Sequence, residues 1–302
     1  MAGELAHRPG ERPRGVCAIT GASGYVGSRI AAHLAGVGWE VRALCRSAPT
    51  LRGDRVAHVP FELASGPTPE ALDGADAVVH AGYDFSHTCW RDISRVNIDG
   101  SRRLLRAARD AQVARVVCVS TVAAFPGTRS MYGRAKLEIE RLALDLGAAV
   151  IRSGLVWGPS GGAMFGALGR AVERLPIVPL LAPADLGLLL ACEDDLVVLV
   201  ERLLDHWPDG SEEVFVAAAA QTVTFVELLR SLSSSSGAAP PFLPVPWRIA
   251  WLGLRCAEML GVTPPFRSDS LLSLIGSDAD PLARATAQAA RYGVSFRAYP
   301  PA

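Results

Sequence analysis

A glycine-rich segment near the N-terminus constrains the fold of this chain more than any other feature. It reads Thr-Gly-Ala-Ser-Gly-Tyr-Val-Gly over residues 20–27, between an apolar run and a helical pattern. The apolar run, Val16 to Thr20, has the composition of a buried parallel strand. In this setting Gly21 permits a tight turn and Gly24 lets the backbone approach a ligand. Gly27 then allows the helix to pack closely against the sheet.

A strand, a turn and a helix in this order predict a binding site for a pyrophosphate. The backbone amides at the start of the helix, from Ser23 through Tyr25 to Val26, face the anion, and the helix dipole stabilises its charge. We therefore interpret the segment as a dinucleotide-binding loop. The alternative interpretation is a tight connection between strand and helix that holds no ligand.

The composition narrows the range of partners. Thirty basic and thirty acidic side chains give a formal net charge of zero, so no overall field favours nucleic acid or an anionic membrane. The six cysteines include no C-x-x-C pair, which favours buried thiols in a reducing cytoplasm over disulfides or a metal site. Residues 1–14 are polar and lack the apolar core of a signal peptide, so we interpret them as a flexible tail. Because no apolar stretch is long enough to span a bilayer, we expect a cytoplasmic protein.

Strand and helix patterns alternate along the first half of the chain. They predict strands at 16–20, 40–45, 55–61, 76–80, 115–120 and 148–152, with long helices at 93–111 and 130–146. This alternation is typical of an α/β fold with a Rossmann-type, doubly wound parallel sheet. The ligand of such a sheet binds beyond the carboxyl ends of its strands.

The second half has a looser pattern, from which we predict a division into domains. Residues 15–155 are expected to form the dinucleotide-binding domain, to which the segment 193–218 returns with a helix and a strand. Residues 156–192 and 219–302 are expected to form a smaller, mostly helical substrate-binding lobe. Within that lobe, residues 231–246 contain four consecutive serines and four prolines, which predicts an exposed connection.

A second motif places a phenol beside an ammonium group. Tyr132 and Lys136 lie four residues apart, so on a helix they share one face. The positive charge of Lys136 favours the phenolate form of Tyr132, which can then exchange a proton with a carbonyl/alcohol pair near neutral pH. The motif follows Thr121, which ends a predicted strand where ligands bind. The Thr121 hydroxyl could bond a substrate oxygen, or it could simply stabilise a turn.

Together these motifs resemble the extended short-chain dehydrogenases/reductases, the NAD(P)-dependent epimerase/dehydratase family. The resemblance covers nearly all of residues 15–297. Besides the glycine-rich segment and the Tyr-Lys pair, the matching stretches are Asp76-Ala-Val-Val-His-Ala-Gly82, Asn97-Ile-Asp-Gly-Ser101, Val119-Ser-Thr-Val-Ala-Ala-Phe125 and Arg152-Ser-Gly-Leu-Val-Trp-Gly-Pro159.

The resemblance implies a catalytic triad. Thr121 takes the Ser/Thr place, Tyr132 is the acid/base, and Lys136 lowers the pKa of Tyr132 while binding the nicotinamide ribose. Asn97 matches a structural asparagine near the proton path. Family members often form dimers through the two long helices beside the catalytic strand, so a homodimer is expected here.

The resemblance also implies that Ala81 and Gly82 line the cofactor and that Glu62 and Leu63 lie beside the adenine. The identity of the cofactor depends on charge. A carboxylate at the end of the second strand would repel a 2′-phosphate, but this strand ends in Arg46, which can pair with that phosphate. We therefore expect NADP rather than NAD.

Three departures disfavour the nucleotide-sugar substrates common in this family. Only ten residues separate Thr121 from Tyr132, where those enzymes have a much longer loop. The stretch 186–192, which often carries groups that hold a diphosphate, is apolar here, and an unpaired diphosphate is costly to bury. Phe125 replaces a usual tyrosine. The many aromatic and aliphatic residues around 247–259 also favour an apolar ligand, although such residues more often form a core.

These observations predict an NADP-dependent oxidoreductase. It would reduce the carbonyl, or oxidise the alcohol, of a small or medium apolar substrate through Thr121, Tyr132 and Lys136. One alternative is an epimerase or dehydratase that holds its NAD(P) tightly and returns the hydride. Another is a dinucleotide-binding scaffold or redox sensor without turnover. No metal, nucleic acid or membrane partner is expected.

Overall fold

The computed structural model describes residues 13–51, 53–159, 161–182, 185–207, 214–237, 240–262, 266–276 and 286–300. These residues fall into two compact units. Unit 1 comprises the described residues of 1–120, 138–151 and 197–214. Unit 2 comprises those of 121–137, 152–196 and 215–302. Each unit has its own packing and is described separately below.

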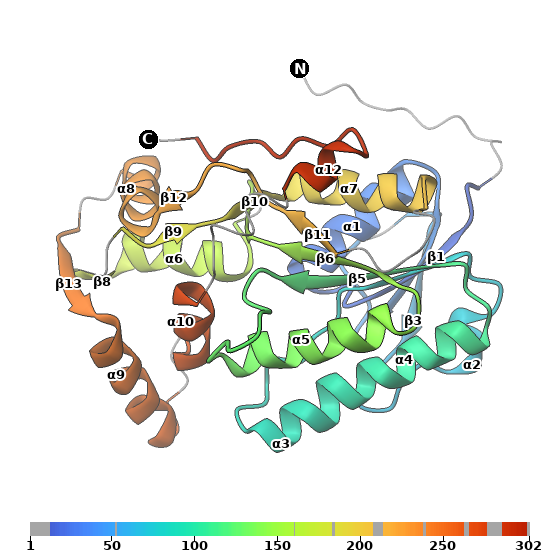
Figure 1. Ribbon diagram of the computed structural model, residues 1–302, viewed down its shortest axis with the longest axis horizontal. Coiled ribbons are helices and arrows are strands. Elements are labelled where there is room, and N and C mark those ends of the chain that lie inside the picture. The colour runs from blue at the N-terminus through green and yellow to red at the C-terminus, as the bar shows by residue number, and fades with distance from the viewer. Residues whose placement is uncertain are drawn as a thin grey trace. The chain divides into compact units, whose positions relative to one another are not determined.

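A seven-stranded sheet has the order β11-β6-β5-β4-β1-β2-β3. Its strands are β1 (Val16–Thr20), β2 (Glu40–Cys45), β3 (Val56–Pro60), β4 (Ala77–His80), β5 (Arg115–Thr121), β6 (Ala149–Ser153) and β11 (Val214–Ala217). The chain reverses its direction of winding between β1 and β4, which is the switch point at which such sheets bind ligands. The predicted Rossmann-type parallel sheet is therefore confirmed, and Figure 1 labels its strands.

Continuous apolar runs explain the central strands of unit 1. Cys17, Ala18 and Ile19 of β1 are fully buried, as are the three residues 77–79 of β4. A parallel strand covered on both faces has no polar side, so its sequence reads as an unbroken apolar run. β1 pairs in parallel with both β2 and β4, which places the ends of these strands at one edge of the sheet.

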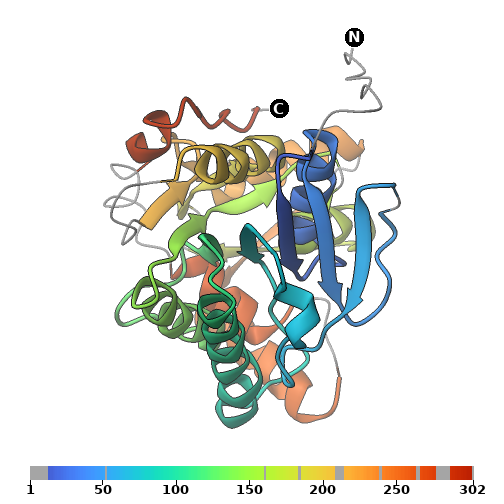
Figure 2. The same ribbon diagram turned by 90° about the vertical axis from the view of Figure 1, so that its right-hand side faces the viewer.

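Helices cover both faces of the sheet in unit 1. α1 and the unit 1 part of α7 lie on one face, and α4 and the unit 1 part of α5 lie on the other (Figure 2). The bounds are α1 (Tyr25–Gly36), α2 (Pro69–Leu72), α3 (Trp90–Ile93), a π-helical turn η1 (Ser94–Ile98), α4 (Asp99–Asp110), α5 (Met131–Leu144) and α7 (Glu193–Asp205). α4 buries Leu104, Leu105 and Ala108 on one side, as its amphipathic sequence predicts.

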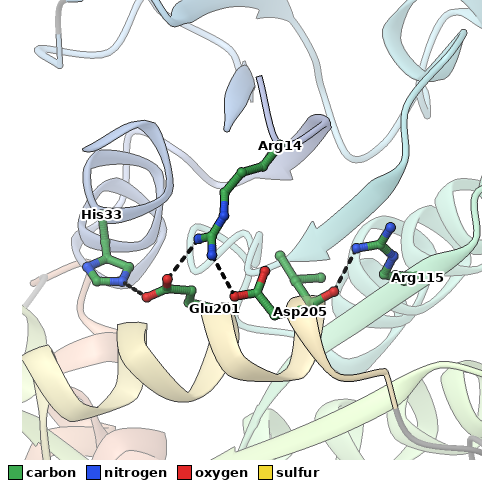
Figure 3. Close-up of polar contacts among 6 residues, drawn as sticks. Arg14, His33, Arg115, Glu201 and Asp205 are labelled. Carbon is green, nitrogen blue, oxygen red and sulfur yellow. Dashed lines mark hydrogen bonds and ion pairs between the residues drawn. The ribbon is translucent and has the colours of Figure 1, made fainter. Parts of the chain in front are cut away.

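Polar contacts attach the start of the described chain to α7 (Figure 3). The Arg14 guanidinium donates to Glu201 at 2.9 Å and to Asp205 at 3.0 Å, and the His33 ring lies 2.7 Å from the other Glu201 oxygen. Arg115 donates to a backbone carbonyl near the end of α7 at 2.7 Å. Residues 1–12 of the predicted tail lie outside the described residues, whereas Arg14 is held by two ion pairs.

Unit 2 combines helices with short strand pairs. Its strands pair as β7 with β10, β8 with β13 and β9 with β12. Their bounds are β7 (Leu155–Trp157), β8 (Val178–Ala182), β9 (Gly187–Leu188), β10 (Leu190–Cys192), β12 (Val223–Thr224) and β13 (Phe242–Pro246). The helices are α6 (Ala163–Arg174), α8 (Phe225–Ser236), α9 (Trp247–Met259), α10 (Ser268–Ile275) and α12 (Ala287–Ala290). They enclose an aliphatic core that includes Leu190, Leu228 and Leu271.

The prediction of an exposed connection over residues 231–246 is confirmed in part: most described residues from Ser234 on are exposed, but a helix and a strand replace the expected loop. α8 begins at a capping box of Thr224 and Glu227 and continues to Ser236. Two of its serine hydroxyls, Ser235 and Ser236, bond to carbonyls of the preceding turn. Residues 242–246 then form β13. This strand contains prolines, but it lies at the edge of a two-stranded pair, where prolines are tolerated.

No helix among the described residues has both the length and the hydropathy needed to cross a membrane.

Candidate active site

The glycine-rich turn of unit 1 is closely packed around backbone atoms. Gly21 has φ +70°, and a Cβ there would lie 2.8 Å from the Cα of Gly82. A Cβ on Gly27 would lie 2.2 Å from the carbonyl oxygen of Gly21. Any larger residue would therefore shift the backbone of the turn. The structure brings Gly82 against the glycine-rich turn, together with its neighbour Ala81 at the end of β4.

The N-terminus of α1 is suited to an anion from outside the protein. Gly24 is its N-cap, and within the described chain no side chain caps it and its first turn holds no acidic residue. Tyr25 and Val26 begin the helix, so their amides lie at the positive end of the dipole. These features fit the diphosphate of a dinucleotide.

The end of β2 lies beside the same turn. The Cys45 thiol is hydrogen-bonded to Ser23, yet burial raises the pKa of Cys45 above its ordinary value. The thiol therefore stays neutral at physiological pH and does not compete with an anion for the turn.

A chain of buried hydrogen bonds holds the residues next to the glycine-rich turn. Thr20 Oγ1 lies 2.7 Å from His80 Nδ1, and His80 Nε2 lies 2.7 Å from Ser101 Oγ. The backbone amide of Gly82 also donates to Thr20 Oγ1 at 3.1 Å. Both nitrogens of the fully buried His80 ring are thus used within the protein. Its role is to fix the backbone next to Gly21.

Arg46 follows β2 directly and is largely exposed, with 69% of its side chain accessible. Its guanidinium lies 3.7 Å from the Asp84 carboxylate. Burial alone would raise the pKa of Asp84, but hydrogen bonds from Ser86 and the charges of Arg46 and His87 hold it below its ordinary value. Asp84 is therefore a carboxylate that a phosphate would have to displace from Arg46.

Three more residues singled out by the sequence analysis, Asn97, Glu62 and Leu63, lie in unit 1. The buried Asn97 amide accepts from the backbone amide of Asp84 at 2.7 Å and donates to its carbonyl at 3.1 Å, so Asn97 fixes this loop. Glu62 and Leu63 follow β3, with Glu62 exposed and Leu63 buried. Since β1 to β4 are parallel neighbours, Arg46, Glu62 and Gly82 all follow carboxyl ends of strands at one edge of the sheet.

The predicted triad lies in unit 2. Thr121 ends β5, whereas Tyr132 and Lys136 occupy the first turns of α5. Lys136 is 3% exposed, and Tyr132 is half-buried. The Thr121 hydroxyl accepts a hydrogen bond from the backbone amide of Ala123 at 3.2 Å. This contact uses the acceptor side of the hydroxyl, so its proton remains available for donation to a substrate oxygen.

A carboxylate that the sequence analysis missed caps the helix of the triad. Asp269, from α10, accepts from the backbone amides of Met131 at 2.7 Å and Tyr132 at 3.0 Å. The Ser130 hydroxyl donates to the same carboxylate at 3.2 Å, and accepts from the amide of Gly133 at 3.0 Å. Ser130 is a recognisable N-cap in the sequence, but no local pattern links Asp269 to it.

Unit 1 contains a second missed acid. Glu140 lies one helical turn after Lys136 in the sequence of α5 and is 1% exposed. The Ser120 hydroxyl donates to its carboxylate at 2.5 Å. A carboxylate at this depth needs such partners to remain buried. Its signal in the sequence is an acidic residue on the apolar face of an amphipathic helix.

Comparison with known proteins identifies the family of the chain. Residues 17–160 match the model of the NAD dependent epimerase/dehydratase family. A ceramide reductase from Caulobacter vibrioides is 30% identical over 249 residues, which are 77% of this chain and 74% of that protein. The chain belongs to the NAD-dependent epimerase/dehydratase family. It is an NAD(P)-dependent enzyme of the extended short-chain dehydrogenase/reductase type, as the motifs predicted.

Two further relatives extend the comparison. A 4-hydroxy-2-methyl-3-oxo-4-farnesyl-3,4-dihydroquinoline-1-oxide ketoreductase from Stigmatella aurantiaca is 28% identical over 172 residues, which are 46% of this chain and 50% of that protein. The solved structure of MoeE5 in complex with UDP-glucuronic acid and NAD has a TM-score of 0.70 at 21% identity, and covers 94% of this chain and 95% of MoeE5. The family fold therefore extends over nearly the whole chain.

Proposed function

We propose that this enzyme is an NADP-dependent reductase of an apolar ketone, or the dehydrogenase of the corresponding alcohol. The observation that carries the proposal is the triad in unit 2. A buried Lys136 lies one helical turn from Tyr132, and the Thr121 hydroxyl accepts from a backbone amide, which leaves its proton for donation. The Asp269 cap holds the start of this helix by its backbone.

These side chains have distinct roles in the proposed reaction. The reduced nicotinamide, when bound, supplies a hydride to the carbonyl carbon. Tyr132 donates its phenolic proton to the carbonyl oxygen as that oxygen gains negative charge. Lys136 stabilises the phenolate that remains, because an ammonium one turn away favours the charged phenol. Thr121 donates a hydrogen bond that orients the same oxygen.

The choice of NADP depends on Arg46. A guanidinium can form paired, charge-assisted hydrogen bonds with a phosphate. Arg46 stands where a carboxylate would instead accept from the ribose hydroxyls of NAD. Its exposure leaves the side chain able to turn from Asp84 toward a 2′-phosphate.

An apolar substrate is supported by the apolar sequence of unit 2 and by the relatives. The stretch 186–192 contains no basic residue, and residues 188–192 are buried. A diphosphate buried there would lack donors from this stretch. The two reductases named above carry ceramide and a farnesyl group in their names, and both of these contain long hydrocarbon chains.

The test is the substitution Tyr132→Phe, with Tyr299→Phe as the matched control. Tyr299 packs against Trp157 and Phe165 in unit 2 and is no part of the triad. We expect Tyr132→Phe to lower kcat for ketone reduction by about a hundredfold or more with NADPH affinity retained. Tyr299→Phe should leave kcat unchanged. Equal turnover in the two variants would contradict the proposal.

The measured stoichiometry separates the alternatives. A reductase consumes one NADPH for each alcohol formed, whereas an epimerase or dehydratase shows no net oxidation of the nicotinamide. A scaffold or sensor would bind NADPH without turnover on any ketone of a broad panel.

A further inference from the structure

Helix α9 (Trp247–Met259) of unit 2 has apolar side chains on two opposite sides. It follows β13 and lies beside α10 (Figure 1). One side packs against the core of unit 2 through Trp247, Ala250, Trp251 and Leu254. None of the residues of α9 is fully buried, so this contact covers only part of the helix.

The other side of α9 is an exposed apolar stripe. Its members are Ile249 (63% exposed), Leu252 (56%), Met259 (77%) and Leu260 (83%), together with Cys256, which is also exposed. At about 100° per residue these positions fall within a sector of about 100°. Leu243 before the helix and Val262 after it are more than half exposed as well. Single exposed apolar side chains are normal, but a continuous set along one face marks an interaction site.

Basic residues flank this stripe. At about 100° per residue, Arg248 and Arg255 of α9 lie next to Met259 at one edge of the stripe. The Arg255 side chain is 43% exposed and pairs with Glu258 at 3.5 Å. The only acidic residue of α9 is Glu258, which is 11% exposed and accepts from the amide and hydroxyl of Ser268. The side of the helix that meets solvent therefore carries positive charge and apolar groups, with its single carboxylate turned inward.

We propose that α9 lies in the surface of an anionic lipid bilayer, with the stripe in the acyl region and the arginines at the headgroups. Arginines beside an apolar face are typical of interfacial helices that lie in the membrane plane. The chain needs no spanning helix for this mode of binding. The zero net charge of the chain also allows it, because a local basic edge acts within a Debye length.

Charge favours a bilayer over a second copy of this chain. In a symmetric dimer in which the stripes pair antiparallel, the edge of α9 that carries Arg248 and Arg255 would run along the same basic edge of the other copy. Like charges that meet at an interface oppose association. Anionic headgroups instead neutralise these arginines while the acyl chains cover the stripe.

The experiment is co-sedimentation of the full chain with large vesicles, in the absence of substrate. We compare phosphatidylcholine vesicles with vesicles that also contain phosphatidylglycerol. The test variant is Leu252→Gln with Leu260→Gln. The control is Leu175→Gln with Ile177→Gln, which changes two exposed apolar residues outside the stripe (43% and 51% exposed).

We expect the unaltered chain to bind the anionic vesicles and the test variant to bind at least about tenfold more weakly, while the control binds as the unaltered chain does. Arg248→Gln should weaken binding to anionic vesicles only, and should reduce its salt dependence. Absence of vesicle binding, or equal binding by the test variant, would overturn the proposal. So would a dimer in solution that the test variant dissociates, because the stripe would then be a subunit contact.

The outcome is independent of the proposed reductase activity. Turnover of a short, water-soluble ketone should be equal in the test variant and the unaltered chain, since the stripe is separate from the triad. Loss of vesicle binding with intact turnover therefore tests only the proposed role of α9. Loss of turnover in Tyr132→Phe tests only the proposed reaction.

Discussion

Two helix N-termini, one in each unit, stabilise negative charge in different ways. α1 begins at Gly24 without a side-chain cap and without an acidic residue in its first turn, within the described chain. α5 begins under the Asp269 carboxylate, which accepts from the amides of Met131 and Tyr132. Both helices present the same partial positive charge. In α1 that charge is available to an external anion, whereas in α5 a carboxylate of the protein uses it.

The absence of a side-chain cap on α1 and its presence on α5 fit the different roles proposed for the two helices. A turn that accepts a phosphate benefits from small side chains and from a helix start without a side-chain cap, as in the glycine-rich turn. A helix that holds the proposed acid/base in one place benefits from an internal cap, because the cap fixes the first turn, which contains Tyr132. Asp269 also stabilises α10, because it lies in the first turn of that helix, where a negative charge is favoured by the helix dipole.

The strongest test of the α1 side is the substitution Gly27→Ala. Its Cβ would lie 2.2 Å from the Gly21 carbonyl oxygen, so the turn must move. Overpacking of this kind costs about 1–3 kcal/mol, and we expect NADPH affinity to fall by about tenfold to a hundredfold. Titration of protein fluorescence with NADPH measures the change.

Gly36→Ala is the matched control, because a Cβ at the end of the same helix meets no atom within 4 Å. It should keep the affinity of the unaltered chain. Equal losses in both variants would show that the turn has no special role.

The α5 side is tested by Asp269→Ala. Loss of a cap that accepts from two amides should lower the free energy of unfolding by about 1–2 kcal/mol. It should also lower kcat severalfold with little change in NADPH affinity, since the triad helix loses its anchor while α1 keeps its own. Asp269→Asn should restore part of kcat, because its amide oxygen can still accept from one backbone amide.

The control for this prediction is Asp110→Ala, whose side chain is 72% exposed. Unfolding in denaturant and steady-state kinetics are the two measurements. A loss of stability without any loss of kcat would assign Asp269 a purely structural role.

A third prediction concerns the contact proposed between Arg46 and the 2′-phosphate of NADPH. Arg46→Ala should lower NADPH affinity by about tenfold and leave NADH affinity unchanged, because only NADPH carries the 2′-phosphate. Arg42→Ala should not change the ratio of the two affinities. The Arg42 guanidinium already donates to the backbone carbonyl of Asp73 at 2.5 Å and of Ala71 at 3.3 Å, near the end of α2. An unchanged ratio in Arg46→Ala would favour NAD as the cofactor.

The smallest effect on stability is expected for Glu201, a carboxylate that is held by cationic side chains instead of helix amides. Burial alone would raise the pKa of Glu201, but hydrogen bonds from Arg14 and His33 lower it below its ordinary value. The stabilisation is therefore present above the ordinary pKa of the carboxyl and is lost as the pH falls through the lowered one. Because Arg14 is 40% exposed, we expect Glu201→Gln to cost only about 0.5–1 kcal/mol at neutral pH.

Thermal unfolding across a pH series measures this difference, with the exposed Glu173→Gln as control. The gap in Tm between Glu201→Gln and the unaltered chain should close at acidic pH. A gap that is constant with pH would mean that the carboxylate charge contributes nothing.

The elements that could be predicted share a local cause. β1 and β2 occur at the predicted residues, and β5 extends one residue further, to Thr121. Buried parallel strands have unbroken apolar sequences, so their limits are visible. The prediction of a loop was wrong at 231–246, where serines and prolines indicate one by propensity. A helix and a strand form there because tertiary context overrides that propensity.

The sequence by itself specified two features: the glycine-rich turn between a strand and a helix, and the pair Tyr132 and Lys136 on one helix face. Both depend only on residues a few positions apart. Contacts between distant segments determined the rest. Asp269 caps a helix 137 positions before it, His80 bonds to Thr20 and Ser101, and α9 buries one apolar side while the other stays exposed. No local pattern contains this information, because hydrogen-bond partners and burial are properties of the folded chain.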